Sequence, residues 1–511
     1  MLSREPLFDK RRTVVRLVRE ALALAGRFYR TSDGRGFFFN SVERRLFDLD
    51  QRPFAQLLTA LSGLSRTEAV FGFVLDVLQA ETARSAPEVP VHALAAYDMA
   101  SGCLAVSDGA GGVWVRERGS AWTCTGNGDA ALFLTEPDAT GWVPDWSGAR
   151  GALSWFLAGF LFSSSGDLSR EDQQAILLVR LVQEFFPPLR RTRAIPTFLG
   201  PQGSGKTSAG RRIGRLLVGP AFEVTGLARD KEDGFIAAVT NQTVAVFDNA
   251  DSRIPWLEDA LATYATGTRH RRRRLYSTND MVAYDSRALL LLSSRDPRFN
   301  RPDVAERILP FRFDRPPTYL PEGPLYDELE ARRGAIWAGL LEQLAAAQEA
   351  LATTQPAPSV VRMADFDSFG WRLSAPLGQT KAWATLIAKI EGAQGAFAAE
   401  GDGVVEALRI FVEREGALGP LPVATLFKLT QAIAHDKDLK FPQTVQGFGQ
   451  RLSNLHRIIE LELRVRMVDT RGRGRARSIE LRPLATRPPG EAGGDGEDIR
   501  QRVFNSQEPL P

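Results

Sequence analysis

The sequence is poor in the residues that hold disulfides and zinc. Its 511 residues include two cysteines and four histidines. Cys103 and Cys124 stand 21 positions apart, and neither belongs to a CxxC pair. The spacing therefore predicts no disulfide framework and no zinc ribbon, and a reducing cytoplasm is the expected location.

Long apolar runs are also missing. The longest, ALSWFLAGFLF at 152–162, is much shorter than the roughly 20 residues that a membrane-spanning helix needs. The N-terminal stretch MLSREPLFDKRRTVVRLVREALALAG mixes charged and apolar residues at helical spacing and lacks the apolar segment of a signal peptide. We therefore expect neither membrane insertion nor secretion.

The chain has little net charge, +3, with 44% hydrophobic and 24% charged residues. These values are typical of a soluble globular protein, and the length predicts about three domains. Positive charge is concentrated locally: residues 269–315 hold twelve arginines against six acids, and residues 451–482 hold nine against four. Two basic surfaces are expected.

Changes in residue pattern divide the chain. A helix is expected over 14–29, a hairpin over 34–49, and short strands with turns over 91–134. The Gly- and Pro-rich tail is expected to be disordered. The predicted regions are an N-terminal α+β region (1–165), a nucleotide-binding motor (166–320), a helical region with linker (321–401), a C-terminal folded unit (402–484) and a tail (485–511).

The strongest motif is GPQGSGKT at 200–207, which fits G-x-x-x-x-G-K-[ST] at every fixed position. It follows the apolar run AIPTFL and precedes the helical pattern SAGRRIGRLLV. Backbone N–H groups of such a loop surround phosphates, so ATP with Mg²⁺ is the predicted ligand. Lys206 is expected to contact the β- and γ-phosphates, and Thr207 to bind the metal. The predicted nucleotide-binding residues are Gly200, Pro201, Gln202, Gly203, Ser204, Gly205, Lys206, Thr207 and Ser208.

A second strand, in QTVAVFDNAD at 242–251, ends in Asp248. A hydrolytic phosphate loop needs a carboxylate at such a strand end to hold Mg²⁺, so Asp248 is the predicted second metal ligand. The next residue is Asn249 and not a water-activating Glu. Asp251 is a candidate for that task, which otherwise stays unassigned.

A third strand, ALLLLSS at 288–294, ends in two hydroxyls. Its uninterrupted apolar run is typical of a strand buried on both faces. In ring ATPases a polar side chain at this place contacts the γ-phosphate or the attacking water. Ser293 is the predicted catalytic residue here, with Ser294 as the alternative.

The segment RPDVAERILPF at 301–311 brings arginines near the site. An arginine from a neighbouring subunit stabilises transition-state charge in many such enzymes. Arg307 is the predicted residue, with Arg301 and Arg312 as rivals. The alternative is a surface arginine paired with Asp303 or Glu306.

The order of these elements resembles the superfamily 3 helicases of viruses, phages and plasmids. It is most similar to the phage and mobile-element ATPases related to the helicase part of poxvirus-type primase-helicases. The resemblance extends over about 195–315 and weakly into the N-terminal half. It implies an α/β fold with an AAA+-like P-loop NTPase core. It also implies a homo-oligomeric ring, usually a hexamer, that moves on single-stranded DNA in a bacterial host cytoplasm. Two features depart from the family: the third strand ends in Ser and not Asn, and the basic segment is denser in Arg.

That basic segment is RHRRRRLYS at 269–277. Taken alone it fits a solvated loop or a nuclear address, but a localisation signal is not expected inside a motor. The resemblance implies a hairpin that directs cations at the DNA backbone. Arg271 and Arg272 are the predicted pore contacts, and Arg273 is assigned either to DNA or to the ATP site or subunit interface. Arg274 is a further DNA contact, and Tyr276 is expected to stack on a base.

The C-terminal unit shows three helical patterns, at 404–415, 423–434 and 442–459, followed by two strands around a Gly/Arg loop. This order resembles a winged helix, in which the third helix enters a major groove of duplex DNA. The alternative is a helical bundle whose basic hairpin contacts protein. The loop residues predicted to contact DNA are Arg471, Arg473, Arg475 and Arg477.

The leading functional hypothesis is an ATP-dependent DNA helicase or translocase in phage or mobile-element replication. The alternative is a regulatory or defence ATPase that binds DNA under ATP control without unwinding it. A small-molecule kinase would leave both basic segments without a purpose. Because no acidic metal triad is found outside the motor, any primase is expected on a separate protein.

Overall fold

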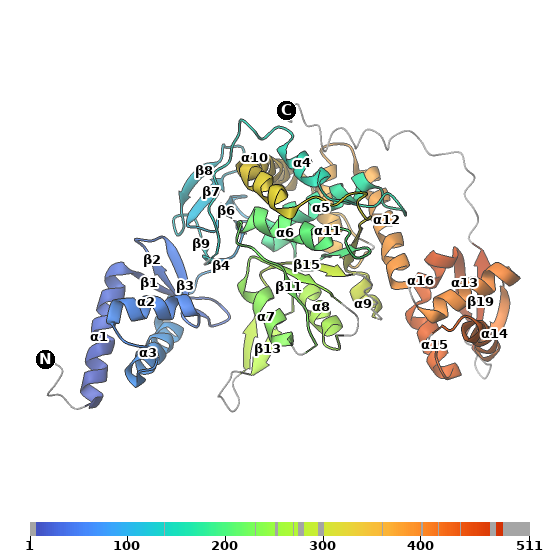
Figure 1. Cartoon of the computed structure of the whole chain (residues 1–511), viewed down its shortest axis with the longest axis horizontal. Helices are drawn as coiled ribbons and strands as arrows, with labels where there is room; N and C mark the ends of the chain where they lie inside the picture. Colours follow the sequence, from blue (N-terminus) through green and yellow to red (C-terminus); the bar gives the residue numbers. More distant parts are fainter. Residues whose placement is uncertain are drawn as a thin grey trace.

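The computed structural model describes residues 7–136, 138–229, 231–250, 254–268, 270–273, 281–294, 301–359, 361–399, 402–416, 418–439, 441–470 and 477–483. Figure 1 shows an N-terminal unit and a C-terminal unit at opposite ends of the long axis, with a parallel sheet between them. Within the described ranges, no helix combines the length and the apolar character needed to cross a bilayer.

The N-terminal unit packs three helices on a small antiparallel sheet. The sheet has the order β1-β2-β3, formed by Gly26–Arg30, Gly36–Asn40 and Arg45–Asp48. Helices α1 (Leu7–Ala25), α2 (Arg52–Ser62) and α3 (Ala69–Ser85) supply the rest. Their apolar faces meet in a core that includes Leu22 of α1, Phe38 of β2, Phe54 and Leu58 of α2, and Val74 of α3.

The helix expected over 14–29 is shorter at its C-terminal end, so that prediction is wrong beyond residue 25. Helix α1 ends at Ala25, and Gly26 begins strand β1, which pairs with β2. A Cβ atom on Gly26 would lie 1.8 Å from the carbonyl oxygen of Phe39. The close approach of the two strands therefore requires glycine at this position, and it ends the helix.

Residues 91–134 hold six short strands. Four of them form an antiparallel sheet in chain order: β5 (Ala95–Tyr97), β6 (Leu104–Ser107), β7 (Gly112–Arg116) and β8 (Thr123–Gly126). The others, β4 (Val91–His92) and β9 (Leu132–Phe133), pair in parallel. Helices α4 (Ala152–Ala158) and α5 (Arg170–Glu184) then lead to the central sheet.

The central sheet has five parallel strands in the order β11-β12-β15-β10-β16. Strand β15 thus separates the strand that precedes the phosphate loop from the strand that ends in Asp248. Because all five strands are parallel, their carboxyl ends lie along one edge. The strands are β10 (Ile195–Leu199), β11 (Thr225–Gly226), β12 (Val244–Asp248), β15 (Leu289–Ser294) and β16 (Ile308–Arg312).

Helices cover both faces of this sheet, which makes the motor a mixed α/β structure (Figure 1). Leu289 and Leu291 of β15 face a core shared with α5, α6 (Lys206–Leu217) and α10 (Glu322–Thr353). Leu290 and Leu292 face the other core, shared with α7 (Glu232–Asn241), α8 (Leu257–Thr266) and α9 (Pro302–Ala305). The apolar run of β15 is therefore buried on both sides, as expected for a parallel strand.

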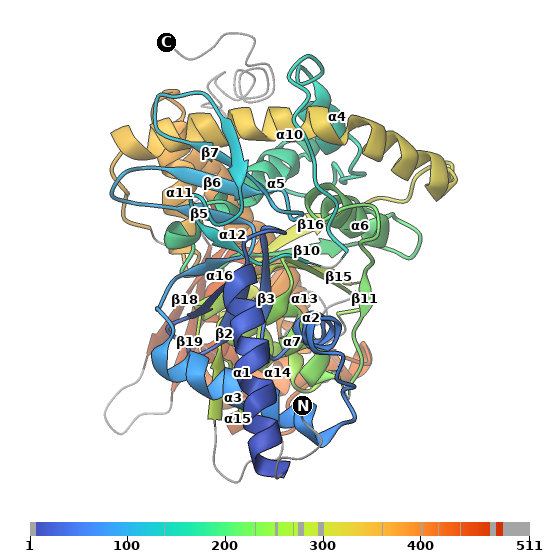
Figure 2. The same cartoon turned by 90° about the vertical axis from the view of Figure 1, so that its left-hand side faces the viewer.

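Two helices connect the motor to the C-terminal unit. Helix α11 (Ala364–Ser374) packs between α10 and α12 (Thr380–Ala399), and α12 lies beside α16 of the C-terminal unit. Figure 2 shows α10 extended across one side of the molecule, along α4 and the β5–β8 sheet.

The C-terminal unit follows the order helix, strand, helix, helix, helix, hairpin. Strand β19 lies between β17 and β18 in an antiparallel sheet. The elements are α13 (Gly403–Glu415), β17 (Leu418–Pro422), α14 (Val423–Asp436), α15 (Val445–Asn454), α16 (His456–Leu463), β18 (Val465–Thr470) and β19 (Ser478–Pro483).

The third helix predicted over 442–459 is not continuous. It is divided at Leu455 into α15 and α16, and the second segment extends to Leu463. Phe448 and Leu452 on α15, Leu455 at the break and Ile459 on α16 all enter one core. The periodicity of the apolar residues located the core face correctly but did not show the break.

Candidate functional site

The phosphate-loop motif lies between β10 and α6, at the carboxyl edge of the sheet. The Nζ atom of Lys206 donates hydrogen bonds to the carbonyl oxygens of Gly200 and Pro201, each 2.7 Å long. A Cβ atom on Gly200 would come within 2.5 Å of the carbonyl oxygen of Phe313. Glycine is therefore required where the loop passes the chain after β16. The loop keeps a buried ammonium group next to its own backbone.

Asp248 connects the loop to the third strand. The hydroxyl of Thr207 donates a 2.9 Å hydrogen bond to Oδ2 of Asp248. The hydroxyl of Ser293, which is fully buried, donates to Oδ1 of the same carboxylate. The parallel register explains this contact, because Phe247 and Leu292 are paired neighbours one residue earlier. Three residues predicted from separate motifs therefore meet.

The structure distinguishes the two candidate serines. Ser293 lies beside Phe198 and its side chain contacts Asp248. Ser294 pairs with Leu199 and is also buried. Successive side chains of a strand point to opposite faces. Only Ser293 is thus placed on the carboxylate.

The chain turns sharply after Asp248. Asn249 adopts a positive φ of 58°, a conformation that asparagine tolerates better than most residues. Its backbone N–H donates a 2.8 Å hydrogen bond to Oδ1 of Asp248. The N–H of Ala250 donates to the carbonyl oxygen of Ser293. The turn thus holds the carboxylate at the strand end, while Asp251 lies outside the described residues.

These donors suit a hard cation. Thr207 and Asp248 present a hydroxyl and carboxylate oxygens on neighbouring elements, 2.9 Å apart. Mg²⁺ is commonly held by one or two such protein oxygens, with water and phosphate oxygens completing its shell. The geometry fits the prediction that Thr207 and Asp248 are ligands of one Mg²⁺ ion.

A segment that sequence motifs did not identify covers the loop. The Nε atom of Arg315 donates a 2.9 Å hydrogen bond to the carbonyl oxygen of Gln202. The hydroxyl of Ser208 donates to Glu322, 2.6 Å away, at the start of α10. The hydroxyl of Tyr319 would be 2.8 Å from a Cβ atom on Gly203. Residues 315–322 therefore lie along one side of the phosphate loop.

Exposed apolar side chains flank the same loop. Tyr319 is 66% exposed, and Leu161, which lies nearest to Gly205, is 40% exposed. The sequence holds only a weak indication that this segment lies beside the phosphate loop, namely a Tyr-Leu pair between prolines in RPPTYLPE at 315–322.

Two of the three candidate arginines lie at opposite ends of strand β16. Ile195 pairs with Ile308 and Leu199 pairs with Arg312, so Arg312 lies at the loop edge. Arg307, before Ile308, lies at the opposite edge. Five residues of strand correspond to about 16 Å. Arg307 therefore lies at the sheet edge opposite to the phosphate loop of its own chain.

Arg301 is held by acidic neighbours. It forms ion pairs with Asp303, at 2.9 Å, and with Asp259 of α8. Its hydrogen bonds hold the pKa of the Asp303 carboxyl below its usual range. Arg307 instead donates from Nη1 to the backbone oxygen of Asp303, 2.8 Å away. Of the two, Arg301 is the one neutralised by carboxylates.

The basic segment begins as an antiparallel hairpin. Strand β13 (His270–Arg273) pairs with β14 (Met281–Tyr284). The structure describes the backbone at Arg271, Arg272 and Arg273; Arg274 and Tyr276 lie outside the described residues. A hairpin at this position agrees with the expectation from the sequence.

The chain just after this hairpin is attached at two points. The Nη2 atom of Arg193 donates a 2.7 Å hydrogen bond to the carbonyl oxygen of Ser286. Arg287 forms an ion pair with Asp33 of the N-terminal unit, 3.9 Å away. Burial is the main cause that lowers the pKa of Arg287, and the neighbouring Arg35 lowers it further. The hairpin base is thus connected both to the motor and to the N-terminal unit.

Arg477 has a structural position in the C-terminal unit. Its guanidinium forms an ion pair with Asp469, 2.7 Å away, across the base of the β18–β19 hairpin. It also donates to the carbonyl oxygen of Gly449 and to the hydroxyl of Ser453 on α15. Arg477 therefore fastens the hairpin to α15. Arg471, Arg473 and Arg475 lie outside the described residues.

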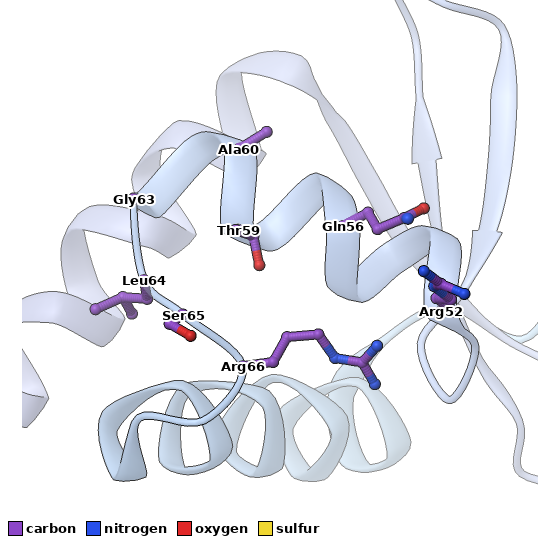
Figure 3. A pocket seen from close by; sticks show the side chains of 8 residues that line it. All are labelled: Arg52, Gln56, Thr59, Ala60, Gly63, Leu64, Ser65 and Arg66. Carbon is purple, nitrogen blue, oxygen red and sulfur yellow. The ribbon is translucent and has the colours of Figure 1, made fainter.

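A shallow groove lies apart from these sites, on the N-terminal unit between α2 and the start of α3. In Figure 3 the side chain of Arg66 extends along the groove toward the end where Arg52 lies. None of the residues predicted for ATP, metal or DNA lines it. The lining residues are Arg52, Gln56, Thr59, Ala60, Gly63, Leu64, Ser65 and Arg66.

Residues 169–390 match a family model described as an actinomycete integrative conjugative element replication protein. The matched range contains the phosphate loop, Asp248 and Ser293. This description agrees with the mobile-element part of the resemblance. No curated protein matches the chain.

Solved structures show weak likenesses. The C-terminal region of NrS-1 is 11% identical, with a TM-score of 0.39 over 91% of this chain and 98% of that chain. A JCV helicase is 12% identical, with a TM-score of 0.21 over 47% of this chain and 71% of that one. Drosophila ORC bound to DNA is 13% identical, with a TM-score of 0.15 over 66% and 91% of the respective chains. Scores this low establish neither a common fold nor a common activity.

Proposed function

We propose that this protein is an ATP-dependent DNA helicase or translocase that serves the replication of a mobile element. The observation that carries the proposal is the contact of Thr207 and Ser293 with the same carboxylate, Asp248, beside the phosphate loop. These are the positions from which a P-loop enzyme holds a metal and recognises the phosphate to be cleaved. The family match over 169–390 supports the biological setting.

The nucleotide is proposed to lie along the loop. Backbone N–H groups of residues 200–208 and the ammonium of Lys206 would hold its phosphates, and Thr207 and Asp248 would bind Mg²⁺. When bound, the metal neutralises charge on the β- and γ-phosphate oxygens. Leu161 and Tyr319, exposed on two sides of the loop, are proposed to cover the base.

The proposed assembly is a homo-oligomeric ring, with six copies as the expected number. Arg307 supports it, because this arginine lies at the sheet edge opposite to its own phosphate loop. An arginine so placed serves catalysis only at the site of a neighbouring copy. There it would stabilise the charge that develops during phosphoryl transfer.

Single-stranded DNA is the proposed track. The β13–β14 hairpin would direct Arg271 and Arg272 at the DNA backbone in the pore, with Arg274 and Tyr276 as further contacts. Arginine contacts with phosphate tolerate any sequence and weaken as salt increases. A motor that moves along DNA requires this kind of binding.

The C-terminal unit is proposed to be a winged helix that binds duplex DNA. Its helix order and its β17-β19-β18 sheet support this assignment. The loop arginines Arg471, Arg473 and Arg475 would contact phosphates, whereas Arg477 positions the hairpin. This division refines the prediction that all four arginines contact DNA.

The test is an ATPase assay with and without single-stranded DNA, combined with mass photometry of the same sample. We expect hydrolysis that DNA stimulates, in a particle several times the mass of one chain. Lys206→Ala should abolish turnover, and Lys381→Ala, an exposed lysine on α12, should not change it. A monomer whose hydrolysis ignores DNA would refute the proposal.

The alternative, an ATP-controlled DNA-binding regulator, is favoured by one observation: the C-terminal unit has features of duplex recognition. A strand-displacement assay separates the two. Unwinding of a forked duplex supports the motor. DNA-stimulated hydrolysis with neither unwinding nor translocation would support the regulator.

A further inference from the structure

Helix α15 presents a polar but uncharged face to solvent. Gln446 and Gln450 are exposed, and Phe448 and Leu452 on the other side enter the core. The helix contains one charged residue, Arg451, and that residue forms an ion pair with Asp402, 2.5 Å away. Neutral amides and a hydroxyl therefore dominate the exposed face, whose residues are Gln446, Gln450, Ser453 and Asn454.

The spacing of the amides places them in a row. Gln446, Gln450 and Asn454 stand four residues apart, which is close to one turn of an α-helix. At 1.5 Å per residue, the row spans about 12 Å. This length corresponds to about three or four base pairs at 3.4 Å each. Thr444 caps the helix by accepting a 3.1 Å hydrogen bond from Gly447, so the row begins on a fixed backbone.

Positive charge lies in the adjoining hairpin. From Arg464 to Arg482 the chain has seven arginines against two acids, which are Asp469 and Glu480. On strands β18 and β19, Arg466 and Arg482 are directly opposite each other and exposed. Arg482 also forms an ion pair with Glu480, 2.8 Å away. The excess of arginines over acids in this segment nevertheless makes the hairpin basic, as binding to a polyanion requires.

Arg477 makes the two surfaces one unit. Its contacts with Gly449 and Ser453 attach the base of the hairpin directly to α15. Gly449 and Ser453 lie between or beside the exposed amides on the helix. The distance between the cationic hairpin and the amide row is thus set by the fold before any ligand binds.

We propose that α15 enters the major groove of duplex DNA and recognises a specific site that contains adenines. The inference rests on the proposed DNA-binding role of the C-terminal unit and adds what that unit recognises. Gln and Asn amides match the N6 donor and N7 acceptor of adenine in the major groove. Arginine contacts with phosphates give affinity, and the amides give sequence preference.

The surface favours duplex DNA over a protein partner. Interfaces between proteins are centred on buried aromatic or aliphatic anchors. On α15 the apolar residue that is notably exposed is Val445, at 38%, at the first position of the helix. Amides in a row beside a strongly basic hairpin instead match base edges flanked by phosphates. Figure 1 shows α15 on the side of the C-terminal unit away from α12. The side chains of its amide row are exposed.

The test is selection of duplexes from a random library by the full chain, followed by sequencing and titration. We expect an enriched motif of about three or four base pairs with adenine at two or more positions. The variant Gln446→Ala/Gln450→Ala/Asn454→Ala should bind random duplex within about threefold of the wild type. Its preference for the selected site over random duplex should fall by about tenfold or more for each amide that contacts an adenine. Gln431→Ala, an exposed amide on α14, is the matched control and should retain the motif.

Each outcome bears on the inference. Duplex binding without an enriched motif overturns it, and so does a triple variant that selects the same motif as the wild type. Both outcomes leave the proposed DNA-binding function in place. A chain that binds no duplex at all overturns the winged-helix role and this inference together. In that case the stimulation of ATP hydrolysis by single-stranded DNA still tests the proposed motor function separately.

Discussion

The hydroxyl of Ser293, at the end of β15, donates a hydrogen bond to the carboxylate of Asp248, at the end of the neighbouring strand β12. The third strand of the site is thus coupled to the carboxylate that is proposed to bind metal, by a side chain shorter than the asparagine usual in the resembling family. A serine reaches Asp248 because the two strands are adjacent in the sheet.

Ser293→Ala should lower the turnover of DNA-stimulated ATP hydrolysis by about tenfold. The variant removes a hydrogen bond to a charged group, worth about 1.5–3 kcal/mol. Steady-state turnover at saturating ATP measures the effect. Ser294→Ala, the next residue on the same strand, is the control. Equal losses in the two variants would contradict the assignment of Ser293.

Arg307→Ala should be inactive alone but should regain part of its activity when mixed with Lys206→Ala. Arg307 lies at the sheet edge opposite to its own phosphate loop, so each variant supplies what the other lacks at shared sites. ATPase activity is measured across mixing ratios after subunit exchange. Activity that equals the sum of the separate variants at every ratio would show that Arg307 does not act between subunits.

The hairpin arginines should separate into two classes. Arg271→Ala/Arg272→Ala should lose stimulation by single-stranded DNA and keep basal hydrolysis. It should also reduce the salt dependence of single-stranded DNA binding by about 1.4 units of slope. Arg273→Ala, if this residue belongs to the ATP site or subunit interface, should lower basal hydrolysis as well. ATP hydrolysis rates measured with and without single-stranded DNA in one assay distinguish the two roles. If single-stranded DNA stimulates the double variant as strongly as the wild type, the hairpin does not contact the DNA.

Glu184→Gln should destabilise the motor by about 3–5 kcal/mol. Glu184 is buried and forms ion pairs with Arg180, at 2.8 Å, and Arg190, at 3.0 Å. Loss of its charge leaves two buried cations without their shared partner. Thermal and denaturant unfolding measure the change. Glu171→Gln, an exposed glutamate in the first turn of the same helix, should have a small effect.

His92 should make stability depend on pH in the acid range. Burial, with a contribution from Arg287, lowers its pKa from 6.5 to about 4. Between these values the unfolded chain takes up a proton that the folded chain does not, so stability falls as the pH falls. The loss is about 2–3 kcal/mol over the window. Melting temperatures from pH 7 to pH 4 should fall less steeply for His92→Gln than for the wild type. Parallel curves would contradict this role, and His435→Gln, on the exposed side of α14, is the control.

Local patterns predicted much of the site. The phosphate loop, Asp248 and Ser293 each stand at the end of an apolar strand, and this pattern can be recognised within about ten residues of sequence. The sequence could not decide between Ser293 and Ser294, because that choice depends on the face of the assembled sheet to which each side chain points. Likewise, Arg477 looked like one of four equivalent loop arginines until its contacts with Asp469 and α15 were known.

The sequence by itself determined the α/β character of the motor, its predicted ligand, and the two basic segments, since these depend on residue type and spacing within short windows. Tertiary structure decided which distant groups meet. It placed residues 315–322 along the phosphate loop and Arg307 at the far edge of its own sheet. It also attached Asp33 to the base of the hairpin. Contacts of this kind join residues that are up to about 250 positions apart, and no local periodicity encodes them; the packing of the folded chain does.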